Sequence, residues 1–201
     1  MRRSEWITAW GSGSVLVVLA FLAAMMTQGW DLFSLTPPAS DAVPNPAPDV
    51  TSQDALSLYQ AAYTAWSALL LLVPVYLFVF SRGTVWLAFW TVSFVAYAIH
   101  IAVSAFGFFG GDFEWMTNST RVSAFWPGMA LLVWWPIDLA LAFAQREGMA
   151  IRVQRVLLHI VTLVLFVGGS AIKGELMVTQ IMGWVLLAAA VLSLVRWRLQ
   201  R

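Results

Sequence analysis

Three ionisable side chains lie in apolar stretches on either side of a short polar turn, with Asp138 before it and Arg155 and His159 after it. Arg155 precedes His159 by one helical turn and shares its helix face. At 1.5 Å per residue, Asp138 lies about 9 Å before the end of its predicted helix, and His159 about 8 Å after the start of the next. Because helices joined by a short turn pack antiparallel, we expect these three residues to form one polar cluster.

This cluster allows two kinds of chemistry inside a membrane. The first is a structural salt bridge that holds two helices in register, and the second is a proton relay or an anchor for a charged substrate. Pro136, two residues before Asp138, frees a backbone carbonyl and permits a kink, which favours a functional site. The sequence leaves both interpretations open.

A second set of polar residues is expected near the other membrane face, between the second and third apolar stretches and the last one. This outer polar seam comprises His100, Tyr63, Gln60, Ser104 and Gln180. Hydrogen bonding across the seam would join the helices. The functional alternative is a small outward-facing pocket near Gln180, Thr179 and Trp126.

The residue types offer little support for a cofactor. The chain has no cysteine, which removes thiolate metal sites and thiol nucleophiles, and we recognise no phosphate-binding glycine loop, zinc-binding histidine pair or nucleophile elbow. Counted from opposite membrane faces, His100 and His159 are about 12 Å apart along the membrane normal, too far to share one haem iron. Haem ligation by one histidine and one of the eight methionines stays open. We predict no cofactor, no metal and a non-enzymatic protein.

The composition predicts an all-α, polytopic transmembrane helix bundle formed by the single domain 1–201. Of its residues, 61% are hydrophobic and only 10% charged, whereas a soluble domain carries roughly 25% charged residues. A net charge of +1 excludes a nucleic-acid binder. Each membrane crossing needs about 20 apolar residues, and six spans are predicted at 8–29, 56–80, 85–109, 122–144, 153–172 and 176–195.

Two further features of the chain are expected between and within these spans. An acidic, proline-rich loop occupies residues 31–54 and cannot be helical, and Thr51 with Asp54 resembles a capping box that begins the second span. Within the fifth span, Gly168 and Gly169 are expected to let a neighbouring helix approach closely.

The basic residues predict that both termini lie in the cytoplasm. Two basic residues, Arg121 and Lys173, fall on the outer side, against nine on the inner side, as the positive-inside rule requires. The nine are Arg2, Arg3, Arg82, Arg146, Arg152, Arg155, Arg196, Arg198 and Arg201. The preference for arginine over lysine is typical of a bacterium, so we expect a multi-pass protein of the bacterial cytoplasmic (inner) membrane.

Three functional hypotheses follow from a bundle with few intramembrane polar groups and extensive apolar and aromatic surface. The leading one is a non-enzymatic accessory or assembly subunit, with other membrane subunits or further copies of the chain as partners in the lipid bilayer. The second is a small transporter or proton-coupled channel that uses Asp138 and His159. The third is a quinone- or haem-linked membrane redox protein.

Overall fold

The structure, a computed structural model, describes residues 3–26, 52–80, 84–119, 124–174 and 176–200. Within these residues it is all-helical and has no strand. The elements are α1 (Arg3–Met26), α2 (Ser52–Phe78), α3 (Val85–Ala102), η1 (Val103–Phe108), α4 (Phe113–Asn118), α5 (Phe125–Phe143), α6 (Met149–Val167), η2 (Gly168–Ile172) and α7 (Met177–Leu199). The π-helical segments η1 and η2 continue α3 and α6. All of the helices except the short α4 are long and apolar enough to cross a membrane, which makes six candidate spans and is consistent with a multi-pass membrane protein.

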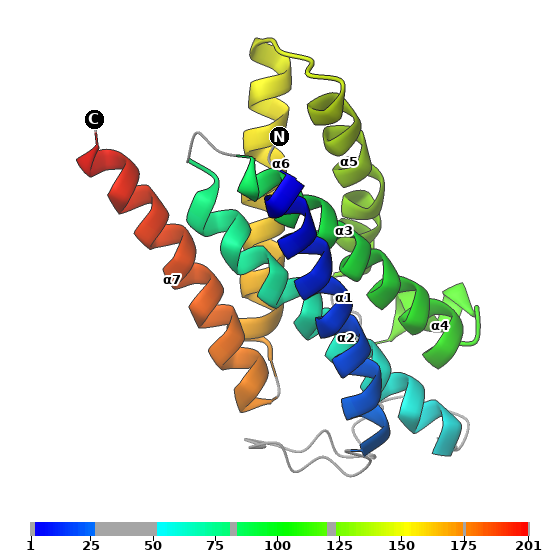
Figure 1. The fold of residues 1–201 in the computed structure, drawn as a ribbon. Coiled ribbons are helices and arrows are strands. Elements are labelled where there is room, and N and C mark those ends of the chain that lie inside the picture. The colour runs from blue at the N-terminus through cyan, green and yellow to red at the C-terminus, as the bar shows by residue number, and fades with distance from the viewer. Residues whose placement is uncertain (1–2, 27–51, 81–83, 120–123, 175, 201) are drawn as a thin grey trace.

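The long helices alternate in direction along the bundle (Figure 1). Helix α1 begins, and α7 ends, at the same end of the bundle, and we call this the terminal end. Helices α3 and α6 also begin there, whereas α2, α5 and α7 begin at the opposite end, where α4 lies. Long helices that follow one another along the chain are therefore antiparallel, whereas the packed pairs α1–α3 and α2–α7 run in the same direction, as do α3 and α6.

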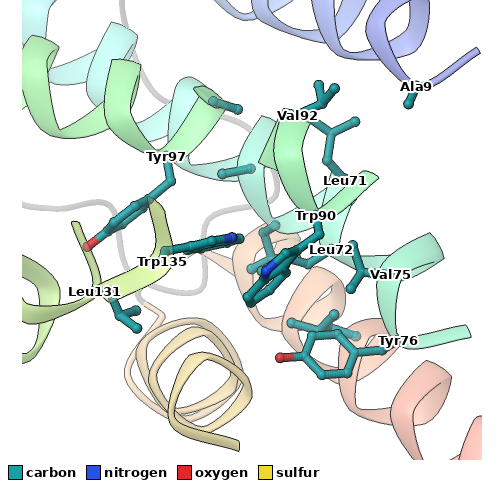
Figure 2. Packing of buried hydrophobic residues seen from close by; sticks show 14 of the residues in the cluster. Ala9, Leu71, Leu72, Val75, Tyr76, Trp90, Val92, Tyr97, Leu131 and Trp135 are labelled. Carbon is teal, nitrogen blue, oxygen red and sulfur yellow. The ribbon is translucent and has the colours of Figure 1, made fainter. Parts of the chain in front are cut away.

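The centre of the bundle is formed by α2, which packs against α1, α3 and α7. Leu71, Leu72 and Val75 of α2 are buried beside Trp90 of α3 (Figure 2). Helices α1 and α7 lie at the periphery, where most of their residues are exposed. Since lipid tails are as apolar as leucine, exposure of leucine and valine on these helices carries little cost in a membrane.

Three helices extend further at the terminal end than the sequence predicts. Helix α1 begins at Arg3 instead of residue 8, α6 begins at Met149 instead of residue 153, and α7 ends at Leu199 instead of residue 195. The prediction ended each span where apolar residues stop, but arginine, glutamine and glutamate have high helix propensity. The backbone therefore stays helical beyond the apolar run. Arg196 and Arg198 also stabilise the carboxyl end of α7 through the helix dipole.

The segment after η1 is not wholly the polar loop that the sequence predicts, because it contains the short helix α4. The Asp112 side chain accepts a hydrogen bond from the backbone N–H of Trp115 at 2.9 Å and caps this helix. Met116 is buried against Phe108 and Phe109 at the end of η1. This apolar contact explains why a helix forms where the polar composition favours a loop.

Residues 52–54, which the sequence predicted to be loop, instead belong to α2, whereas residues 31–51, including the proposed capping residue Thr51, lie outside the described residues. Helix α2 begins at Ser52, directly after that residue. The α5–α6 turn is described, and at its end Gly148 has a positive φ of 153°, a conformation that glycine adopts without steric cost.

Helix α7 packs closely against η2 at Gly183. A Cβ atom at this position would lie 2.5 Å from the backbone nitrogen of Ala171 and would also overlap the Ser170 hydroxyl. The close approach predicted at Gly168 and Gly169 is wrong, because a Cβ at either would meet nothing within 4 Å. The glycine that allows close packing between α7 and η2 therefore lies on α7 and not on the fifth span.

We predict that Gly183→Ala destabilises the bundle, because an added methyl group must push α7 away from η2. The expected loss in the free energy of unfolding is about 1–3 kcal/mol, as for other overpacked contacts. Thermal or denaturant unfolding of the detergent-solubilised protein measures it. Gly168→Ala is the matched control, and it should be neutral or stabilising by up to about 1 kcal/mol because alanine favours helix. Equal losses in both variants would contradict the close packing of α7 on η2.

Candidate functional site

The Asp138 carboxylate on α5 is completely buried and accepts hydrogen bonds from three side chains. Its Oδ1 accepts hydrogen bonds from Nε of Arg155 at 2.9 Å and from Nε2 of Gln154 at 2.8 Å. Its Oδ2 accepts a hydrogen bond from the indole Nε1 of Trp90 on α3 at 3.2 Å. Gln154 is in turn held by the indole N–H of Trp134 at 2.8 Å. One carboxylate thus joins α3, α5 and α6, and its charge is balanced by Arg155.

The two members of this ion pair have different access to the surface. The Arg155 side chain is 25% exposed, whereas that of Asp138 is 0% exposed. The guanidinium carbon of Arg155 also lies 5.6 Å from the ring centroid of Trp86 on α3, within range of a cation–π interaction. The Arg155 side chain is therefore partly exposed, although its Nε bonds to the buried carboxylate.

His159 lies beside this cluster but does not take part in its hydrogen bonds. Its ring packs against Trp90 at a centroid distance of 4.1 Å and is flanked by Tyr76 and Trp86 at 5.9 Å each. Neither ring nitrogen has a hydrogen-bond partner among the described residues. The expected contact between His159 and Asp138 is replaced by Trp90, whose indole donates to the carboxylate while its ring covers the imidazole.

A cavity of about 670 Å³ lies in the half of the bundle away from the terminal end. Its wall is formed by α2, α3, η1, α4, α5, α6, η2 and the start of α7. The lining is mainly apolar, and its polar side chains are Tyr97, His100, Ser104, Ser170, Lys173 and Thr179. Both π-helical segments contribute to this wall, and such segments are frequent at functional sites because they displace side chains from the regular helical positions.

Hydrogen bonds to the backbone orient several of these polar groups. The Nδ1 atom of His100 lies 2.8 Å from the carbonyl oxygen of Ala61 on α2. Since a carbonyl only accepts, Nδ1 carries the proton, and the neutral ring keeps Nε2 as an acceptor. The Tyr97 hydroxyl donates to the Gly128 carbonyl at 2.9 Å. The Trp66 indole donates to the Thr179 hydroxyl oxygen at 2.8 Å, which leaves the hydroxyl proton of Thr179 free to donate.

The residues of the predicted outer polar seam do not all line the cavity. His100 and Ser104 line the cavity, and the bond from His100 to Ala61 does join α2 to α3. Gln180 instead donates to the Gly174 carbonyl in the turn before α7, at 2.8 Å. Gln60 and Tyr63 lie on α2 outside the cavity lining.

The pocket predicted near Gln180, Thr179 and Trp126 agrees with the structure only in part. Thr179 lines the cavity, but Trp126 is 74% exposed and faces outward from α5. The two histidines lie in different layers. His159 packs beside Trp90, which precedes His100 by ten residues or about 15 Å on α3, so they cannot ligate one haem iron. Within the described residues, no three histidine or carboxylate side chains group as a metal site.

Two residues of the carboxylate cluster were missed by the sequence analysis, Trp90 and Gln154. Gln154 directly precedes Arg155, so its place in the first turns of the same helix was an available signal. Trp90 shares a helix face with Ser93 and Tyr97, but nothing in the sequence turns that face towards α5.

Comparisons with protein-family models, with curated proteins and with solved structures found no match to this chain.

We predict that Arg155→Met destabilises the protein more than Asp138→Asn does. Without Arg155 the buried carboxylate loses its cationic partner, and breaking such a buried pair costs about 3–5 kcal/mol. Asp138→Asn leaves a guanidinium that can reach water, so its cost should be smaller. The double variant should recover most of the loss seen in Arg155→Met. Unfolding in detergent or lipid nanodiscs measures the three values.

The matched control is Arg152→Met, one turn before Arg155 in sequence order on α6. Arg152 pairs with Glu147 at 3.6 Å, and both side chains are more than 70% exposed, at 73% and 81%. Surface pairs contribute about 0–1 kcal/mol, so this variant should be nearly neutral. Strict additivity of the Arg155 and Asp138 changes would contradict the ion pair.

Proposed function

We propose that this protein is a non-enzymatic membrane protein that binds a small amphipathic molecule in the cavity between its helices. The observation that supports the proposal is the cavity of about 670 Å³, a volume within the range of roughly 300–1,000 Å³ typical of small-molecule sites. Its wall combines an apolar majority with a few polar groups of defined orientation. Such a wall suits a lipophilic molecule that carries one polar head.

The polar groups of the wall indicate the chemistry of that head. The acceptor Nε2 of His100 suits a hydroxyl group of the ligand, and the Thr179 hydroxyl suits a carbonyl or ether oxygen. Lys173 adds one positive charge to the lining. A quinol, an isoprenoid alcohol or a fatty acid fulfils these requirements, so the quinone-linked hypothesis becomes one outcome of a binding experiment.

The hydrogen bonds of the cavity wall favour binding over catalysis. The hydroxyls of Tyr97 and Ser170 donate to the backbone carbonyls of Gly128 and Phe166. A nucleophile needs a base that takes its proton, and these two protons are instead engaged by carbonyl groups. The same argument applies to Asp138, whose two oxygens are occupied by Arg155, Gln154 and Trp90, which favours a structural clasp over a substrate anchor.

Membership in a larger membrane complex, the leading hypothesis from the sequence, stays a prediction and is compatible with ligand binding. We also propose that the terminal end faces the cytoplasm of a bacterial inner membrane. Nine of the 11 basic residues belong to that side by sequence, and the positive-inside rule supports this orientation.

We predict that native mass spectrometry of the protein, released from mild detergent, detects a bound amphipathic molecule that Ala65→Phe removes. Ala65 lines the cavity from α2, and a benzyl group there occupies the space of the ligand. Ala188→Phe is the control, because Ala188 is exposed on α7 and does not line the cavity. It should retain the bound mass.

A second variant tests the polar head. His100→Leu keeps the apolar wall but removes the acceptor, and it should weaken binding of the identified molecule by about tenfold, the effect of one lost hydrogen bond that leaves a buried group unpaired.

Retention of the ligand in Ala65→Phe would contradict the proposed site. A co-purifying polypeptide without any small molecule would favour the accessory-subunit hypothesis instead.

We predict that a membrane-impermeant amine reagent labels Lys173 in spheroplasts. Lys173 is the single lysine of the chain, it is exposed, and the proposed orientation places it outside. The matched control combines Lys173→Arg with Arg196→Lys, which moves the reactive amine to the exposed carboxyl end of α7. This variant should react only after the membrane is permeabilised, and labelling of intact spheroplasts would reverse the orientation.

A further inference from the structure

Helices α3 and α6 run parallel and in register along the bundle core. Trp90 packs on His159 at 4.1 Å, and seven residues further along both helices Tyr97 packs near Phe166 at 5.7 Å. Equal spacing on both helices fixes their relative height. Ser93 on α3 and Thr162 on α6, each three residues beyond the first contact, therefore lie at the same level.

Trp135 of α5 packs against α3 at the height of Ser93. Its ring centroid lies 4.0 Å from that of Trp90 and 6.0 Å from that of Tyr97, and Figure 2 shows it between the two rings. Trp135 thus packs against α3 on both sides of Ser93, which lies between Trp90 and Tyr97 in the sequence. Three helices meet at a single layer, between the Asp138 cluster and the cavity.

The polar atoms of this layer are buried without partners. Ser93, Thr162 and Trp135 are each 0% exposed. Neither hydroxyl nor the Trp135 indole Nε1 has a hydrogen-bond partner among the described residues, and the same is true of both ring nitrogens of His159 one turn away. Native proteins satisfy the large majority of such groups, with ordered water where protein atoms do not suffice.

The chemistry of the layer suits water. A buried water makes about three hydrogen bonds, and the layer offers two hydroxyls that both donate and accept, an indole N–H that donates, and an imidazole that does both. The Trp90 ring packs against both Trp135 and His159 beside this layer, at 4.0 Å and 4.1 Å.

We propose that the layer of Ser93, Thr162, Trp135 and His159 binds water inside the membrane-embedded core. This water site lies between the Asp138 cluster and Tyr97 on the cavity wall. The site is independent of whether the cavity holds a ligand.

Hydroxyl-radical footprinting tests the site directly, because X-ray pulses convert bound water into radicals that oxidise adjacent side chains. Trp135 should be oxidised in the intact protein despite its complete burial. The double variant Ser93→Ala, Thr162→Val should lower this oxidation several-fold. Thr64→Val is the control, since the Thr64 hydroxyl is equally buried but bonds to the Gln60 carbonyl at 2.7 Å. Absence of Trp135 oxidation in the parent protein would overturn the proposal.

A stability measurement provides a second readout. Thr162→Val removes a hydroxyl at nearly constant shape. If that hydroxyl binds water, its loss should lower the ratio of folded to unfolded protein at equilibrium by about tenfold. Ser93→Ala and Thr162→Val should be non-additive because they share the same water. A neutral or stabilising Thr162→Val variant would show that the hydroxyl binds nothing and would overturn the site.

Discussion

The buried charge of Asp138 imposes the strictest physical requirement on this bundle. A carboxylate inside an apolar, membrane-embedded core must be neutralised and hydrogen-bonded. Three donors meet the requirement, from Arg155 and Gln154 of α6 and Trp90 of α3. All three donors bond to the same carboxylate, so the interaction constrains the rotation and height of α3, α5 and α6 together.

The register set at Asp138 continues through the aromatic rings of the core. Trp90 touches both His159 and Trp135, and Tyr97 touches Trp135 and Phe166. Rings of this size leave little freedom for helices to slide, because interiors are closely packed. The rigid stack separates the ion pair at the terminal end from the cavity at the opposite end.

The two ends of the bundle therefore differ in physical character. Near the terminal end, the hydrogen bonds of Asp138 join α3, α5 and α6. Towards the opposite end, the π-helical segments η1 and η2 interrupt regular packing and border the cavity. A closely packed half beside a half that contains the cavity would position the walls of the proposed site before the ligand arrives.

The sequence by itself determined the class of the fold and much of its helix content, because a membrane helix satisfies its own backbone hydrogen bonds and needs only a sufficiently long apolar run. It also predicted that Asp138 and Arg155 meet, since a short turn between two helices restricts which residues share a depth. It did not identify Trp90 as the third partner, the short helix α4, or the cavity beside His100. These depend on how α2, α3, α5 and α6 rotate about their axes. An apolar run carries almost no information on rotation, because all of its faces are equally soluble in lipid; only the tertiary packing of particular rings and small residues, such as Trp135 and Gly183, decides it.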